Sequence, residues 1–190
     1  LAPLPWTSAT SELRARISFL RREIGEPWPD WSDKALIATS QDWLRPYLAG
    51  MTSINDIKEL NLGMLLRSQL PWPEGGQIDD LVPNTLELAS GRSLPIDYAS
   101  AVKEGTAPVV RVRVQDLFGT KTHPTVAGGR VPLVLHLLSP ADRPIQVTGD
   151  LPGFWSGSWS EVKKDMAGRY PKHQWPDDPA NADPKRMKDR

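Results

Sequence analysis

The chain has 190 residues, enough for one domain with a core or for two small lobes. Its 23 Lys and Arg residues balance 23 Asp and Glu residues, so no overall field attracts it to nucleic acid or to an acidic membrane, and any such binding must be local. Cysteine is absent, which excludes disulfides, thiolate metal sites and thiol nucleophiles and is typical of a reducing compartment. No apolar run approaches the ~18 residues of a membrane span and no signal-peptide pattern is present, so we expect a cytoplasmic protein without membrane insertion.

Residues 1–72 are predicted to form a helical lobe. Apolar residues recur every three or four positions on one stripe of a first helix: Leu13, Ile17, Leu20 and Ile24. Ser32 can cap a second helix, which Pro46 kinks or divides. The spacing from Ser53 to Asp56 fits a capping box for a third helix, and leucines between residues 62 and 70 indicate a fourth.

Residues 73–178 change to the alternating pattern of strands. Two short alternating runs, 85–88 and 93–98, flank a Ser-Gly-Arg turn and predict a hairpin. The run 109–114 alternates valine with arginine, which places Arg111 and Arg113 on one face of a strand. The run 131–138 is nearly continuous in apolar residues and predicts the central strand, and 144–147 predicts a short last strand.

A helix and a tail are expected to end the chain. Ser158 and Glu161 have capping-box spacing, so a terminal helix should begin there, bury Trp159 and stop at Gly168. Residues 179–190 carry little that can be buried and are expected to be disordered. We therefore predict an α+β fold in which an N-terminal helical lobe precedes a small mixed or antiparallel sheet, compatible with a partial barrel, that the C-terminal helix closes.

Motifs of common enzymes are absent from the sequence. There is no G-x-x-x-x-G-K-[ST] phosphate loop, and the glycine pairs at 75–76 and 128–129 lack the neighbouring Lys and Ser or Thr that hold phosphates and magnesium. There is no G-x-S-x-G nucleophile elbow. His123, His136 and His173 lie far apart and have no metal-ligand spacing; we expect His123 to be exposed and His136 to be hydrogen-bonded on its strand. The sequence thus predicts no catalytic residue, no metal site and no cofactor in this chain.

One segment, residues 161–173, is basic enough to consider as a binding site. Its basic residues are Lys163, Lys164, Arg169, Lys172 and His173, and the rings of Tyr170 and Trp175 flank them. Cations interleaved with rings are typical of sites that hold a phosphate backbone and stack a base of a single strand. Arg111, Arg113 and Arg130 join them as candidates if they lie on the same face. The alternative is a solvated helix end whose cations interact with the helix dipole while the rings pack inward.

Three long runs carry a family resemblance: AGGRVPLVLHLLSP at 127–140, GFWSGSWSEVKKDM at 153–166 and GRYPKHQWPDDP at 168–179. They resemble the C-terminal signature of bacterial HrpB-type DEAH-box ATP-dependent helicases, and shorter stretches agree in order from residue 43 onward. The resemblance implies a cytoplasmic parent chain that uses ATP and magnesium, with RNA as the usual substrate. The phosphate loop, the DEAH motif and the arginine fingers of that parent have no counterpart here, so no catalytic residue is carried over.

Two functions remain open at this point. The chain is expected to be the noncatalytic C-terminal region of such a helicase, which guides RNA near the core or docks a partner. Its partners would be the remainder of the helicase chain, single-stranded RNA or another protein. The alternative is a protein-interaction module without nucleic-acid contact, which the zero net charge and the Trp-Pro segments favour. Convergence of the candidate cations on one face would distinguish the two.

Overall fold

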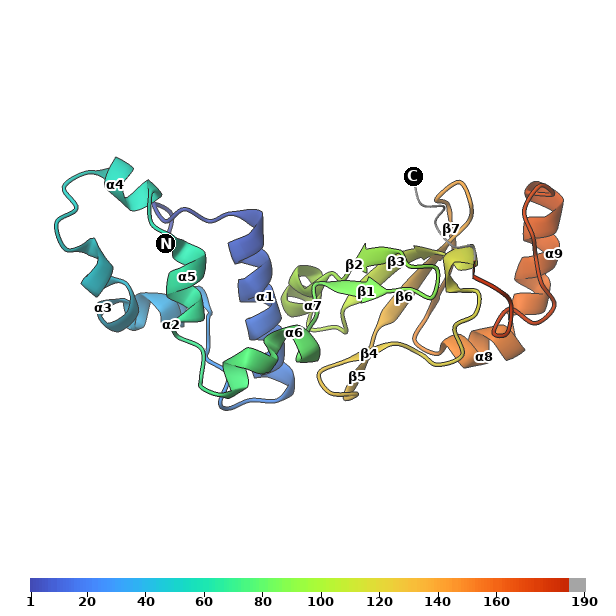
Figure 1. The fold of residues 1–190 in the computed structure, drawn as a ribbon, viewed down its shortest axis with the longest axis horizontal. Coiled ribbons are helices and arrows are strands. Elements are labelled where there is room, and N and C mark those ends of the chain that lie inside the picture. The colour runs from blue at the N-terminus through green and yellow to red at the C-terminus, as the bar shows by residue number, and fades with distance from the viewer. Residues whose placement is uncertain (185–190) are drawn as a thin grey trace.

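Helices form the first part of the computed structural model, which describes residues 1–184 (Figure 1). Their bounds are α1 Ser8–Glu23, α2 Asp33–Ala38, α3 Ser40–Trp43, η1 Arg45–Leu48, α4 Ile54–Lys58, α5 Leu62–Arg67, η2 Glu74–Gln77 and α6 Ile78–Leu81, where η denotes a 3-10 helix. In the part of the chain described, no helix is long and apolar enough to cross a membrane. The helical region predicted to end at residue 72 thus continues for two more short helices.

Helix α1 forms as the sequence predicts. The Thr7 hydroxyl accepts from the Thr10 amide at 3.2 Å, and the Thr10 hydroxyl accepts from the Thr7 amide at 2.8 Å, so a reciprocal capping box begins the helix. The helix ends before Gly25, whose φ of 84° lies in the left-handed region that glycine adopts without strain. Leu13, Ile17 and Leu20 of the predicted stripe are buried and Ile24 is half-buried. Arg16 lies off this stripe but is also only 2% exposed.

The predicted second helix is divided earlier than expected. It breaks at Thr39, whose hydroxyl donates to the Ala35 carbonyl at 2.9 Å, and Pro46 then lies in the 3-10 helix η1. The break turns Trp43 into the core, where its indole Nε1 donates to the Leu36 carbonyl at 3.0 Å. A side-chain bond to the backbone thus competes with helix continuation, which apolar periodicity cannot reveal.

Three small sheets follow instead of one. The hairpin of β1 (Thr85–Glu87) and β2 (Ser93–Pro95) forms as predicted. In the main sheet, β6 (Val134–Leu138) lies between β3 (Val109–Arg113), to which it is parallel, and β7 (Pro144–Thr148), to which it is antiparallel. The third pair is β4 (Thr125–Val126) with β5 (Val131–Pro132). The class is α+β with a mixed central sheet, and no barrel closes within residues 1–184.

The predicted strand 131–138 is interrupted at Leu133. This residue is fully buried, and its amide donates to the Pro124 carbonyl at 3.0 Å, so the chain changes partner between β5 and β6. The continuous apolar run reflects this change of sheet as well as the central position of β6. Short helices that the sequence analysis did not predict connect the strands, namely α7 (Tyr98–Glu104) and η3 (Val114–Leu117).

Two helices, α8 (Leu151–Ser156) and α9 (Trp159–Arg169), lie at the far end of the molecule (Figure 1). The capping box predicted at Ser158 does not form, because Ser158 itself has helical backbone angles in the tight corner between the helices, and α9 continues through Gly168. The segment expected to be disordered also differs in part. Pro179 is buried and its carbonyl accepts from the Gly119 amide at 2.9 Å, so residues 179–184 pack on the sheet region, while residues 185–190 lie outside the described part.

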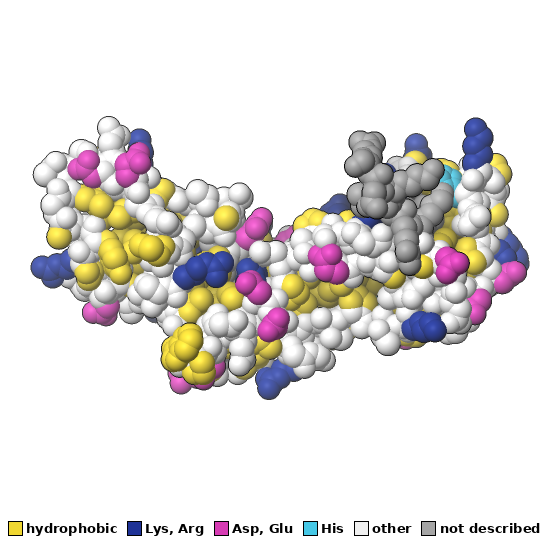
Figure 2. Space-filling model, viewed as in Figure 1, with side chains coloured by type: hydrophobic (Ala, Val, Ile, Leu, Met, Phe, Trp, Pro, Cys, Tyr) yellow, Lys and Arg dark blue, Asp and Glu magenta, His cyan; other side chains and the backbone are white. Residues whose placement is uncertain are grey.

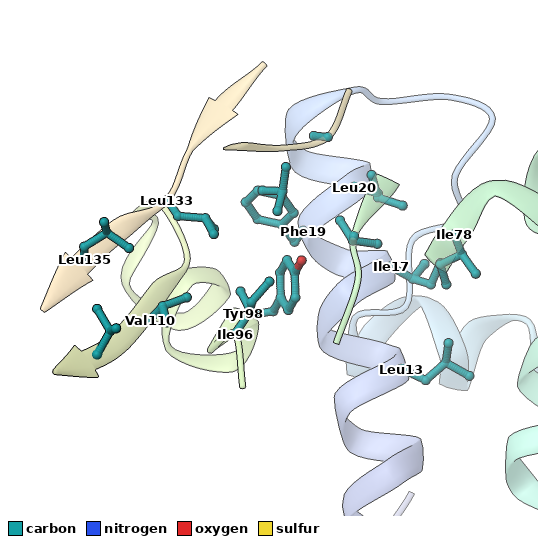
Figure 3. Close-up of a cluster of buried hydrophobic side chains, with 14 of the residues drawn as sticks. Leu13, Ile17, Phe19, Leu20, Ile78, Ile96, Tyr98, Val110, Leu133 and Leu135 are labelled. Atoms are coloured by element: carbon teal, nitrogen blue, oxygen red, sulfur yellow. The ribbon is translucent and has the colours of Figure 1, made fainter. Parts of the chain in front are cut away.

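A single hydrophobic core runs through both regions, with α1 at its centre (Figure 3). Leu13 and Ile17 face Ile78 and the helical side, whereas Phe19 faces Tyr98 and Leu133 on the sheet side. The Phe19 and Tyr98 rings meet edge to face with centroids 5.4 Å apart. Helix α1 therefore packs against both the helical region and the sheet region.

Candidate nucleic-acid interface

Each predicted cation on α9 has an acidic partner. Lys163 pairs with Asp177, Lys164 lies 3.3 Å from a carboxylate oxygen of Glu161, and Arg169 lies 3.0 Å from one of Asp165. Exposed pairs of this kind contribute little to stability, but they cancel much of the field that a phosphate would experience.

The rings beside this strip pack inward. The Tyr170 hydroxyl lies 3.2 Å from the Ser139 hydroxyl, and the Gln115 amide donates to His173 Nδ1 at 2.9 Å. The Trp175 indole donates to the Tyr170 carbonyl at 3.0 Å. Lys172 is exposed and, among residues 1–184, has no acidic group within ion-pair distance.

Five aromatic residues form a cluster under α8 and α9: Phe118, Phe154, Trp155, Trp159 and Trp175. Their ring centroids lie 5.2 to 6.5 Å apart, and the buried Trp159 donates to the Pro176 carbonyl at 3.0 Å. The prediction that Trp159 belongs to the core is confirmed. Phe118, Phe154 and Trp159 are buried and cannot stack on bases, whereas Trp155 and Trp175 are half-buried.

The three remaining candidate cations occupy different surroundings. Arg113 donates two hydrogen bonds, of 2.7 and 2.8 Å, to Asp142, and these bonds hold the pKa of that carboxyl below its usual range. Arg111 is exposed and makes no ion pair or side-chain hydrogen bond within the described chain. Arg130 is exposed in the β4–β5 turn.

The candidates do not gather at one place. The Ala127 amide at the start of the β4–β5 turn donates to the Leu81 carbonyl at 2.6 Å, which holds the turn of Arg130 beside α6. Helix α9 lies at the opposite end of the sheet region, and β3 lies between them (Figure 1). The structure brings Lys163, Lys164 and Arg169 together with acids and leaves Arg111 and Arg130 apart.

The face of the main sheet that carries Arg111 was not identified from the sequence. Strand register sets Arg111 beside His136 of β6, and His136 beside Val147 of β7. His136 is half-buried, and its imidazole forms no hydrogen bond with residues 1–184, so the hydrogen bond expected for it is not observed. Alternation along β3 indicated the face of Arg111, but the residues beside it depend on register, which local sequence does not specify.

A cavity of about 740 Å³ adjoins this face. It lies under the N-terminal half of α1, and Ile96, Tyr98 and Val109 give it apolar walls. Glu12, Asn84 and Arg111 contribute polar groups. The volume is in the range of small-ligand sites.

The described residues do not fit ATP with magnesium. They contain no group of three His, Asp or Glu side chains placed to hold a metal ion. Gly75 and Gly76 lie in the 3-10 helix η2 and Gly128 and Gly129 in the β4–β5 turn, and neither pair leads into a Lys with Ser or Thr.

Comparison with known proteins gives concordant matches. Residues 43–179 match the family model described as ATP-dependent helicase C-terminal. The chain is 43% identical over 187 residues to the ATP-dependent RNA helicase HrpB of Escherichia coli strain K12, a match that covers 98% of this chain and 23% of that protein. The crystal structure of the E. coli DExH-box NTPase HrpB matches with a TM-score of 0.88 at 43% identity, over 98% of this chain and 23% of that chain. A crystal structure of the E. coli DEAH/RHA helicase HrpB matches with a TM-score of 0.73 at 39% identity, over 92% and 22% of the two chains.

Proposed function

This chain belongs to the family of C-terminal regions of HrpB-type ATP-dependent helicases, and on that premise we propose that it is a noncatalytic accessory region that docks on the rest of its helicase chain. It spans less than a quarter of the length of the relatives it matches, so ATP, magnesium and RNA enter here as proposals about the longer protein. The absence of cysteine suits the cytoplasmic location that we propose for it.

One observation carries the docking role. Large apolar side chains are exposed on the helical region, with Ile37, Ile54 and Met64 each between 56 and 65% accessible. Figure 2 shows hydrophobic side chains gathered over α3 and α5. Exposed apolar groups that collect on one part of a surface mark contacts with other protein surfaces.

The test is reconstitution from two pieces. The 190-residue chain is coexpressed with the preceding part of an HrpB-type helicase, and retention of one by the other is measured by size-exclusion chromatography. We expect the wild-type chain to elute with the larger piece and the double variant Ile54→Glu/Met64→Glu to elute alone. Val102→Glu, an exposed apolar position on α7, is the matched control and should leave the complex intact. Separate elution of the wild-type pieces would contradict docking.

RNA guiding is the second candidate. It is supported by Arg111, Arg130 and Lys172, which lack acidic partners in the described chain, and by the name of the E. coli relative, an RNA helicase. The strip predicted from the sequence consists of Lys163, Lys164, Arg169 and Lys172. If RNA lies on this strip, replacing Lys163 and Lys164 by Glu weakens binding of single-stranded RNA at low salt and leaves the ATPase activity of the longer helicase unchanged.

A further inference from the structure

Within residues 1–184, the main sheet has one covered and one open face. Val110, Val112, Leu135 and Leu137 are at most 1% exposed and pack into the core. Because side chains alternate along a strand, their neighbours project to the other side. There, Arg111, His136 and Val147 form a row across the three strands, and Val147 is 58% exposed.

The two polar members of this row form no ion pair and no side-chain hydrogen bond within residues 1–184, although Arg111 contributes, after the hydrogen bonds from Ser100, to the lowered pKa of the Asp97 carboxyl. Arg111 forms no ion pair within the described chain. By contrast, the guanidinium of Arg113, two residues along the same strand, pairs with Asp142. The His136 ring forms no hydrogen bond either. A guanidinium plane and an imidazole ring side by side offer a phosphate contact and two flat surfaces on which unstacked bases can lie.

The cavity under α1 extends this surface, since Val109 and Arg111 belong to both. Two carboxylates line the cavity, Glu12 and Asp97, and hydrogen bonds from Ser100 lower the pKa of Asp97, so that it stays ionised near neutral pH. These charges repel a phosphate, but a carboxylate and the amide of Asn84 can pair with the N–H groups and carbonyls of a base edge. The polar groups of the cavity therefore fit a base, whereas a phosphate would bind Arg111.

We propose that the open sheet face and the adjoining cavity bind single-stranded RNA, with a phosphate on Arg111, one base on His136 and a neighbouring base inserted under α1. The proposal deepens the RNA-guiding function and rests on it. Only an unpaired strand fits, because a base must leave its stack to enter the cavity. The site is separate from the α9 strip, whose cations are neutralised.

Fluorescence anisotropy of labelled ten-nucleotide oligouridine and oligoadenosine with the 190-residue chain tests this site. At 50 mM salt we expect Arg111→Gln to weaken binding about tenfold, the loss typical of one charge-assisted contact. The dependence of log affinity on log salt should become shallower by about 0.7, the value for one phosphate of a single strand. His136→Gln should weaken binding by about fivefold or more, with an unchanged salt slope.

Two variants are matched controls. Lys58→Gln removes an exposed cation on α4, outside the site, and should bind as the wild type does. Lys163→Gln/Lys164→Gln removes the α9 lysines and should also leave binding unchanged if RNA lies on the sheet face. Thermal unfolding confirms that each variant is folded. An RNA duplex of the same length should bind much more weakly than the single strand.

Three results would overturn the proposal. Equal affinities for wild type and Arg111→Gln would exclude the phosphate contact, and a loss confined to the α9 double variant would move RNA to that helix. Absence of RNA binding at low salt, with retention on the helicase piece preserved, would reject this site and leave the docking function standing.

Discussion

The buried arginine of α1 offers the sharpest test of how the two regions are joined. Arg16 Nε donates to the Val82 carbonyl at 2.6 Å and Nη2 to the Ile78 carbonyl at 3.4 Å, and the guanidinium also pairs with Asp79. Arg16→Met keeps most of the buried alkyl volume and removes all of these donors. The Ile78 carbonyl retains the bond from the Val82 amide, so the principal loss is the partner of the Val82 carbonyl.

We expect Arg16→Met to lower the free energy of unfolding by about 2 kcal/mol, since an unpaired buried carbonyl costs roughly 1–3 kcal/mol. Arg16→Ala adds a cavity and should cost about 3–5 kcal/mol. In a chain of this size, 2 kcal/mol corresponds to a fall in Tm of about 4–8 °C, measurable by near-UV circular dichroism. Asp79→Asn is the control and should change stability by less than about 1 kcal/mol, because the carboxylate is 73% exposed. A neutral or stabilising Arg16→Met would refute the role of these hydrogen bonds.

Three further predictions concern the sheet region. Trp159→Ala should destabilise the fold by about 3–5 kcal/mol in chemical unfolding, as expected for a large buried aromatic residue; an unchanged midpoint would place Trp159 at the surface. His123→Ala should cost about 1–3 kcal/mol, because the ring accepts from the Leu151 amide at 2.9 Å and donates to the Leu133 carbonyl at 2.6 Å; unaltered urea stability would disprove this tie. The folded-state pKa of Asp97 is lowered by Ser100, so its contribution is present above the unfolded pKa and is lost as pH falls through the folded pKa. Asp97→Asn should therefore lose less stability than the wild type between about pH 5 and pH 2, and parallel pH profiles would contradict this assignment.

Local chemistry made much of the fold predictable. The predicted features that formed depend on neighbouring residues or on simple periodicity, namely the stripe of α1, the hairpin around Gly91 and a central strand within 131–138. The predictions failed where the burial of a side chain depends on a partner that is distant in the sequence. Arg16 is buried because carbonyls more than sixty residues away accept its hydrogen bonds, and His123 was expected to be exposed but bridges two backbone groups.

The candidate site shows the same division. The basic composition of residues 161–173 was visible in the sequence, but the pairing of Lys163 with Asp177 depends on the turn that brings the chain back along α9. The row of Arg111, His136 and Val147 depends on a parallel register between strands more than twenty residues apart and on an antiparallel one to β7. Neither register is encoded in a local pattern.

The shared position of α1 has a practical consequence for dissecting the protein. A cut between residues 72 and 73 leaves the sheet side without Phe19 and leaves Ile78 and Val82 without the helix they pack against. Truncations at that boundary should therefore yield two poorly folded fragments with exposed hydrophobic core residues, not two independently folded modules. A deletion variant that fails to bind would then seem to lack a binding site when it has only failed to fold. Binding sites should therefore be mapped with point substitutions in the intact chain.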